Sequence, residues 1–146
     1  MHRLSLFERD AAKAQELAEQ LGGLFPQTRI EVLTDDERLI EALLEAQGLV
    51  NATPVGMHVH PGMPLSESAL SAGVLREGLW VADVIYLPQQ TQLVRAARAA
   101  GCEVLTGGYM AVGQAVDAFR LFTGLEPNAE RMAAHFEVLI AAQQGI

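Results

Sequence analysis

The chain alternates short apolar runs with longer segments in which apolar residues recur at helical spacing. The short runs predict strands over residues 4–7, 29–34, 49–51, 79–85 and 103–106. The helical spacing predicts helices over residues 10–21, 35–46, 91–100, 109–122 and 129–143, with a short one around Ser68. Strands and helices in alternation predict an α/β fold, in which a parallel sheet carries helices on both faces.

Local signals at the helix ends support these elements. Asp10 can cap the first helix through its side chain, and Asp35 or Asp36 can cap the second. Thr91 can cap the helix over residues 91–100 in the same way. We expect Gly22-Gly23 to stop the first helix, because glycine commonly follows the last helical residue.

Polar residues and a long loop follow the buried strands. Residues 52–64 hold two glycines and three prolines, and long ordered loops in such folds are often functional. Asn51, just before this loop, can tie it down through its side-chain amide or contact a ligand. Asp83 interrupts an apolar strand, which predicts a buried polar residue with backbone partners or an anchor at the strand end.

Composition narrows the class of partner. The 146 residues fit one domain, and 10 basic against 18 acidic residues give a formal charge of −8. That charge opposes binding to nucleic acid or to an anionic membrane and favours a small-molecule partner. No apolar run reaches the length of a membrane helix and the first residues resemble no signal peptide, so we expect a cytoplasmic protein.

The single cysteine and the paired histidines suggest no further chemistry. Cys102 cannot form an internal disulfide, and we interpret it as a small buried hydrophobic residue. His58 and His60 lie in the long loop without further ligands at a plausible spacing, so we expect no metal site.

Glu8 ends the first strand just before a helix. In dinucleotide-binding folds an acidic residue at such a tip accepts hydrogen bonds from the adenosine ribose, and its charge repels a 2′-phosphate. Glu8 therefore favours NAD over NADP, whereas the neighbouring Arg9 can hold a 2′-phosphate. Taken alone, the pair fits a solvated strand end better than a cofactor contact.

Four stretches in this order resemble the shikimate and quinate dehydrogenase family, and the resemblance runs from residue 4 onward. They are Val50-Asn51-Ala52-Thr53-Pro54-Val55-Gly56-Met57, Asp83-Val84-Ile85-Tyr86-Leu87-Pro88, Gly107-Gly108-Tyr109-Met110 with Gln114, and Phe119-Arg120-Leu121-Phe122-Thr123-Gly124. The family transfers a hydride between a nicotinamide cofactor and a ring hydroxyl of a cyclic polyol acid. Glu8 and His60-Pro61-Gly62 look more like the NAD-using quinate/shikimate branch than the NADP-using biosynthetic branch.

The resemblance implies roles for particular residues. Ala52 and Thr53 would lie along the dinucleotide, and the backbone of Val84 would meet its nicotinamide end. Gly107 would let the backbone approach the nicotinamide, and Met110 would press on its ring. The residues implied as substrate contacts are Tyr86 and Gln114, whereas Tyr109, Phe119 and Phe122 are expected in the core.

The resemblance also implies that part of the fold is absent. We expect a Rossmann-like domain that lacks the first strand and the glycine-rich turn, together with the N-terminal substrate domain that carries the catalytic lysine and aspartate in the family. No catalytic residue is therefore assigned, and the chain alone is expected to be inactive. In a strand order 3-2-1-4-5-6 the missing strand is central, so the remaining strands would pair directly, accept another chain or leave an unstable fragment.

A second hypothesis is a non-catalytic module that binds a partner through an open sheet edge and the last helix. The last helix has an apolar face, formed by Met132, Phe136, Leu139 and Ile140. If this face or the sheet is exposed, it would also favour a homo-oligomer.

Overall fold

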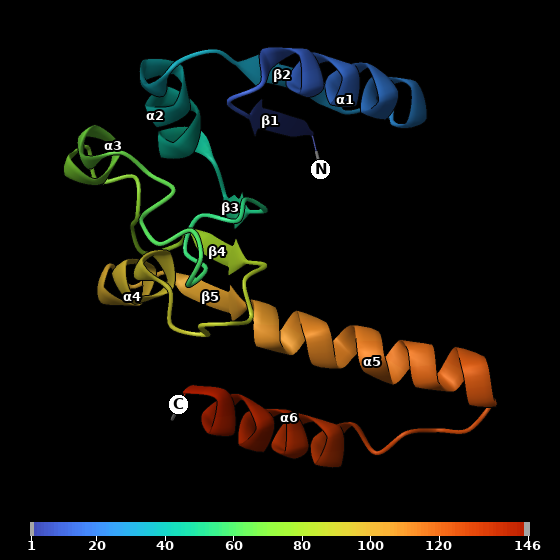
Figure 1. Ribbon diagram of the computed structural model, residues 1–146. Helices are drawn as coiled ribbons and strands as arrows, with labels where there is room; N and C mark the ends of the chain where they lie inside the picture. The colour runs from blue at the N-terminus through green and yellow to red at the C-terminus, as the bar shows by residue number, and fades with distance from the viewer. Residues whose placement is uncertain (1, 145–146) are drawn as a thin grey trace. The chain divides into compact units, whose positions relative to one another are not determined.

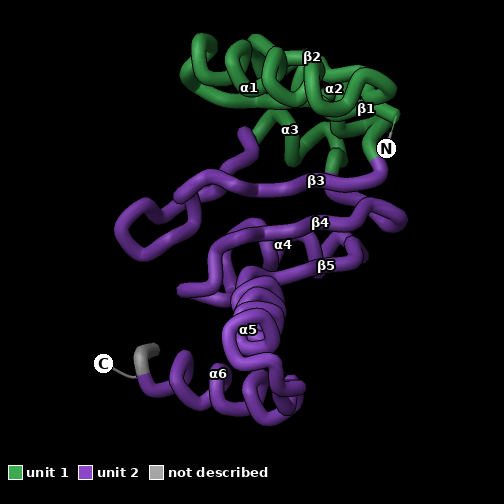
Figure 2. The backbone as a smooth tube through the Cα atoms, turned by 90° about the vertical axis from the view of Figure 1, so that its right-hand side faces the viewer, with its two compact units in different colours: residues 1–46, 67–74 green, residues 47–66, 75–146 purple. Residues whose placement is uncertain are grey.

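The computed structural model describes residues 2–144, which form two compact units (Figures 1 and 2). Of these residues, unit 1 comprises 2–46 and 67–74, and unit 2 comprises 47–66 and 75–144. The predicted α/β class is confirmed, since each unit combines a parallel sheet with helices. No helix among the described residues is long and apolar enough to cross a membrane.

Unit 1 is built on two parallel strands, β1 (Arg3–Phe7) and β2 (Arg29–Leu33). Helix α1 (Ala11–Leu24) connects these strands and packs against both. The unit also holds α2 (Asp36–Glu45) and α3 (Glu67–Ser71), which contact each other. Its buried apolar residues are Ala14, Leu33, Leu39, Leu43, Ala69 and Val74.

Both helix starts in unit 1 are capped as predicted. The Asp10 carboxylate accepts from the Ala12 and Lys13 amides at 3.1 and 3.3 Å. Between the two candidates for α2, Asp35 is the cap, and it accepts from the Arg38 amide at 2.9 Å. This amide lowers the pKa of the Asp35 carboxyl group, because the hydrogen bond stabilises its charged form.

The prediction that Gly22-Gly23 stops the first helix is wrong. Helix α1 continues to Leu24, and the Phe25 amide donates to the Leu21 carbonyl at 2.8 Å. Neither glycine adopts a positive φ angle. A glycine within a helix costs about 1 kcal/mol relative to alanine but keeps its backbone donor, so it weakens a helix without ending it.

Unit 2 contains the parallel sheet β3-β4-β5, formed by Gly48–Asn51, Trp80–Asp83 and Glu103–Thr106. Three helices follow the last two strands: α4 (Gln92–Ala99), α5 (Gly107–Thr123) and α6 (Ala129–Gln144). Helix α4 packs against β4 and β5. The most deeply buried apolar residues of the unit are Leu79, Val81, Leu93, Val94 and Ala97. Cys102 is buried as predicted, and its Sγ lies 3.3 Å from the Arg76 carbonyl oxygen.

One face of the unit 2 sheet carries exposed apolar side chains. Val50 and Leu105 flank Ala82 in the strand register and are 53% and 47% exposed. Trp80 points to the same face, because strand side chains alternate, and is 46% exposed. We call Val50, Trp80 and Leu105 the open face.

Each sheet also keeps two strand edges without a partner strand among residues 2–144, those of β1 and β2 in unit 1 and those of β3 and β5 in unit 2. β1 pairs with β2 alone, and β3 pairs with β4 alone. The direct pairing that was one expected outcome of the missing strand is therefore absent from the described residues. A free edge exposes backbone donors and acceptors that another strand can bind.

Helices α5 and α6 form an antiparallel pair (Figure 1). Several aromatic side chains of α5 are exposed. The expectation that Tyr109, Phe119 and Phe122 lie in the core is wrong, since they are 69%, 40% and 89% exposed. Apolar residues occur around much of α5, and one packed helix cannot cover them all. In α6, Ile140 is buried and Phe136 lies close to Gly108, whereas Leu139 is 51% exposed.

An ion-pair cluster holds the turn after α5. Arg120 donates from Nε and Nη2 to the two Glu126 carboxylate oxygens at 2.9 and 2.7 Å. Its Nη1 donates to Asp117 at 2.8 Å. The hydrogen bonds from Arg120 lower the pKa of the Glu126 carboxyl group. The same bonds raise the pKa of Arg120, because they favour its charged form.

The Arg120–Glu126 pair is expected to respond to acid. Because the Glu126 pKa is lowered in the folded chain, the contact is intact above the ordinary carboxyl pKa and is lost as pH falls through the lowered value. Following the Glu126 carboxyl resonance by NMR during an acid titration measures this pKa. In Arg120→Gln the Glu126 pKa should return towards its ordinary value, and identical titration of both proteins would contradict the pairing.

Candidate functional site

The carboxyl ends of β3, β4 and β5 bring three polar residues into one row. Asn51, Asp83 and Thr106 are paired across the sheet, because each is the last residue of its strand. All three are buried. Ligands of open α/β sheets bind outside the carboxyl ends of the strands, so this row marks the candidate site. We call it the carboxyl edge.

Asp83 is the most buried member of the carboxyl edge and is 0% exposed. Its Oδ1 accepts from the Asn51 Nδ2 at 3.1 Å and from the Ile85 amide at 3.2 Å. Its Oδ2 accepts from the Thr91 hydroxyl at 2.6 Å. Asp83 is thus both the buried polar residue with a backbone partner and the strand-end anchor that the sequence left as alternatives.

Asn51 fixes the start of the long loop, as its structural interpretation predicts. Its Nδ2 also donates to the Val55 carbonyl at 3.2 Å, and its Oδ1 accepts from the Thr53 amide and hydroxyl at 3.1 and 2.7 Å. The Thr53 hydroxyl in turn accepts from the Val55 amide at 3.2 Å. Side-chain hydrogen bonds of Asn51 and Thr53 therefore fix the path of the loop where it leaves β3.

Thr91 has a second role that the sequence analysis missed. It caps α4 as predicted, accepting from the Val94 amide at 3.1 Å. The same hydroxyl donates to Asp83, eight residues earlier in the chain. The signal was available, because a lone Asp in an apolar strand must find buried donors, and a threonine shortly after that strand can supply one.

Gly107 begins α5 at the carboxyl edge and lies against the chain that leaves β4. A Cβ on Gly107 would stand 2.6 Å from the Ile85 carbonyl oxygen and still closer to that of Val84. Only glycine permits this approach of two backbones. A Cβ on the next residue, Gly108, would stand 3.0 Å from the Phe136 ring.

The other residues of unit 2 that are predicted to contact the cofactor or the substrate follow the carboxyl edge and are exposed or half-buried. Ala52 and Tyr86 are exposed, Val84 is 39% exposed and Thr53 is half-buried. Met110 and Gln114 follow on α5, one helical turn apart, and are half-buried and exposed. The close packing of Gly107 places Val84 beside the start of α5. Among the described residues, the side chains of Tyr86 and Gln114 form no hydrogen bond with each other.

In unit 1, Glu8 and Arg9 follow the end of β1 and are exposed. The Glu8 carboxylate accepts from the Asp10 amide at 3.2 Å, which orients the side chain at the strand tip. The strand, acidic tip and helix that the sequence predicted are therefore present.

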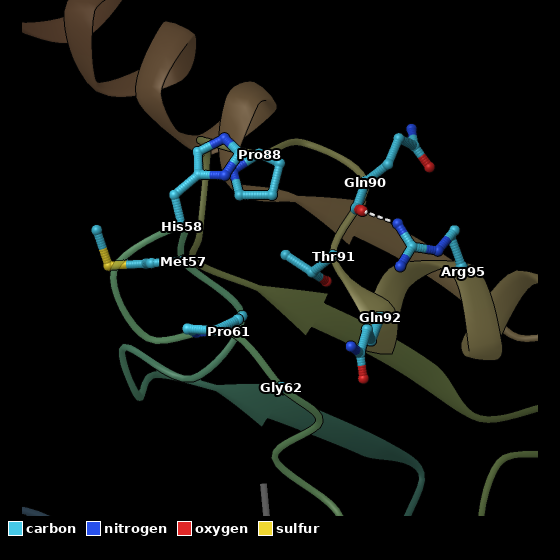
Figure 3. A pocket seen from close by; sticks show the side chains of 10 residues that line it. Met57, His58, Pro61, Gly62, Pro88, Gln90, Thr91, Gln92 and Arg95 are labelled. Atoms are coloured by element: carbon cyan, nitrogen blue, oxygen red, sulfur yellow. Dashed lines mark hydrogen bonds between the residues drawn. The ribbon is translucent and has the colours of Figure 1, made fainter. Parts of the chain in front are cut away.

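A hollow of about 180 Å³ lies between the long loop and the start of α4 (Figure 3). Met57, His58 and Pro61 line its loop side, and Thr91 and Arg95 belong to the opposite wall. The Arg95 guanidinium donates to the Gln90 carbonyl, which is drawn as a dashed line. Within residues 2–144 no group of three or more His, Cys, Asp or Glu side chains is placed to hold a metal ion.

Comparison with known proteins supports the resemblance drawn from the four motifs. Residues 109–135 match the model of the "Shikimate 5'-dehydrogenase C-terminal domain" family. The chain is 51% identical over 144 residues to a shikimate dehydrogenase (NADP(+)) of Arthrobacter sp. (strain FB24). It is 45% identical over 136 residues to a quinate/shikimate dehydrogenase (NAD(+)) of Corynebacterium efficiens. These matches cover 99% and 93% of this chain but 47% and 46% of the two relatives.

Solved structures agree with the sequence matches. A quinate dehydrogenase from Corynebacterium glutamicum in complex with NAD superposes with a TM-score of 0.81 at 42% identity, over 94% of this chain and 46% of that one. A shikimate 5-dehydrogenase from Listeria monocytogenes in complex with shikimate and NAD gives a TM-score of 0.79 at 28% identity, over 94% of this chain and 47% of that one. The resemblance to shikimate and quinate dehydrogenases is thereby confirmed, and it concerns their C-terminal part.

Proposed function

We infer that this chain is the cofactor-binding portion of a shikimate/quinate dehydrogenase. The reaction would transfer a hydride between a nicotinamide cofactor and the ring hydroxyl of quinate or shikimate. The observation that carries this inference is 51% identity to a shikimate dehydrogenase over nearly the whole chain. The chain spans about half the length of that relative, so the activity belongs to the proposal for the whole protein.

The carboxyl edge supplies surfaces suited to the nicotinamide half of the cofactor. Gly107 brings the α5 start against the Val84 backbone, and Val84 keeps an exposed side chain. We assign Val84, Gly107 and Met110 to the nicotinamide end and Ala52 and Thr53 to the adjoining dinucleotide. When bound, the cofactor supplies the hydride acceptor or donor, and these residues would bind it, orient it and exclude water.

Glu8 is the proposed ribose contact and the basis of a preference for NAD. Its exposed carboxylate is free to accept hydrogen bonds from the ribose hydroxyls and would repel a 2′-phosphate. Arg9 offers the opposing attraction. Relatives named for NAD(+) and for NADP(+) both match the chain, so NAD is proposed on the residue chemistry of Glu8.

Binding of NAD and NADP by the purified chain tests both the cofactor class and the preference. Calorimetric titration should show tighter binding of NAD. In Glu8→Gln the preference should shrink by about tenfold, which corresponds to about 1.4 kcal/mol, because the charge that repels the 2′-phosphate is removed. Glu41→Gln, an exposed glutamate on α2, is the matched control and should leave both affinities unchanged. No binding of either dinucleotide would contradict the proposed function.

Tyr86 and Gln114 are the proposed substrate contacts. Both are exposed, and a phenol or amide can hydrogen-bond a ring hydroxyl or carboxylate. The resemblance assigns proton transfer to residues outside this chain, so we propose that the 146 residues alone are catalytically inactive. Quinate oxidation in a single-turnover assay of the isolated chain would overturn that part of the proposal.

A second candidate is a partner-binding module without catalysis. The open face of Val50, Trp80 and Leu105, together with the free edge of β3, favours it. This candidate requires tight self-association or partner binding and no nucleotide affinity. Light scattering at several protein concentrations, read together with the calorimetry, separates it from the dehydrogenase.

A further inference from the structure

Side-chain hydrogen bonds join three separate segments of unit 2 at the carboxyl edge. The segments are residues 51–55, which begin at the last residue of β3, residues 84–86 after β4, and the N-cap of α4 at Thr91. Asp83 is bonded to all three, through Asn51, the Ile85 amide and Thr91. Two of these segments contain the proposed cofactor contacts Thr53 and Val84.

We propose that Asp83 is a positioning residue for the cofactor site. It fixes the loop of residues 51–55 and the exit of β4 relative to the start of α4, and so sets the places of Thr53 and Val84. Asp83 is fully buried, so its side chain offers no surface to a bound cofactor. The part of this inference that concerns the cofactor rests on the proposed function.

The hydrogen-bond donors around Asp83 explain why an aspartate is needed. Its two carboxyl oxygens receive three donors, which are an amide side chain, a backbone amide and a hydroxyl. The Thr91 hydroxyl accepts from the Val94 amide, so its proton is available for Asp83. Asn at position 83 would place an NH₂ group where an oxygen accepts, and one of the three donors would lose its acceptor.

Asn51 links Asp83 to the loop of residues 51–55 through its side-chain hydrogen bonds. Its amide hydrogens go to Asp83 and the Val55 carbonyl, and its oxygen receives the Thr53 amide and hydroxyl. Every donor and acceptor of this side chain is therefore used within one rigid arrangement. Hydrogen bonds from Thr91 to Asp83, from Asn51 to Asp83 and from Thr53 to Asn51 therefore connect the start of α4 to the loop of residues 51–55.

The test compares the purified wild-type chain with Thr91→Val, Thr91→Ser and Asp83→Asn. Valine keeps the shape of threonine and removes the hydroxyl, whereas serine keeps the hydroxyl. Leu79→Ala controls for a general loss of stability, because Leu79 is a buried core residue that precedes β4 at its opposite end. Two quantities are measured, the hydrogen exchange rates of the Thr53 and Val55 amides and the dissociation constant for NAD.

In Thr91→Val and Asp83→Asn, exchange at Thr53 and Val55 should rise about tenfold more than in Leu79→Ala, as expected when a buried hydrogen bond is lost locally. Affinity for NAD should fall by about tenfold in the same two variants, since the contact residues are no longer held in place. Thr91→Ser should match the wild type in both measurements.

Equal exchange at Thr53 and Val55 in Thr91→Val and Leu79→Ala would overturn the proposal, whatever happens to NAD binding. Faster exchange without any change in NAD affinity would also overturn the role of Asp83 in the cofactor site. A wild-type chain that binds neither NAD nor NADP, with the local exchange effect present, would support the positioning of the loop and refute the proposed function instead.

Discussion

Gly107→Ala is expected to lower the free energy of unfolding by about 3 kcal/mol, at the upper end of the usual cost of overpacking. The added methyl group would stand 2.6 Å from the Ile85 carbonyl oxygen and closer still to that of Val84. These atoms belong to the backbone, so no side-chain rotation can relieve the overlap. The α5 start must move away from the exit of β4, which would also disturb the proposed nicotinamide surface.

Urea unfolding of the purified variant measures this loss. Gly113→Ala is the matched control, since it makes the same change in the same helix where nothing lies within 4 Å of the added Cβ. It should stabilise the chain by about 0.5 to 1 kcal/mol, because alanine is the better helix former. Equal effects of the two substitutions would show that α5 does not press against β4.

Leu93→Ala is expected to cost about 2 to 5 kcal/mol, the range for removing a buried leucine side chain. Leu93 is 0% exposed on the face of α4 that packs against the sheet. Truncation removes apolar contacts and leaves a cavity that the surrounding strands cannot fill. Thermal and urea unfolding should both report the loss.

Leu121→Ala is the control for Leu93→Ala. Leu121 is 83% exposed on α5, so its truncation should change stability by less than about 0.5 kcal/mol. A large loss in the control would mean that Leu121 is covered in solution, which would favour self-association through α5. A small loss in Leu93→Ala would contradict the core of unit 2.

The elements with clear local signals were predicted well from the sequence. Asp10 and Thr91 cap the helices assigned to them, and residues 103–106 form the predicted strand. These features depend on neighbouring residues, so a local pattern contains the information. Asp83 was also interpreted correctly as a hydrogen-bonded structural residue, because a polar residue in an apolar strand needs partners. For Asn51 the structural role was one of two alternatives, and its hydrogen bonds to the loop show that role.

The errors concern features that depend on distant contacts. Helix α1 continues through Gly22-Gly23 because its backbone hydrogen bonds remain intact, and the low helix propensity of glycine weakens the helix only slightly. The exposure of Phe122 and Tyr109 depends on which partner covers α5, and apolar character alone does not reveal that partner. The bond between Thr91 and Asp83 joins a helix start to a strand end, and the sequence indicates that Asp83 needs a donor without identifying Thr91 as that donor.

Trp80 gives the open face an optical property of its own. It is the only tryptophan of the chain, it lies against Gly48, and about half of its side chain is in contact with solvent. Indole emission moves to shorter wavelength when water is removed from the ring. A strand, helix or second molecule that covers the open face should therefore shift the emission maximum of Trp80 to shorter wavelength. Intrinsic fluorescence detects this shift without a label and at concentrations far below those that calorimetry requires.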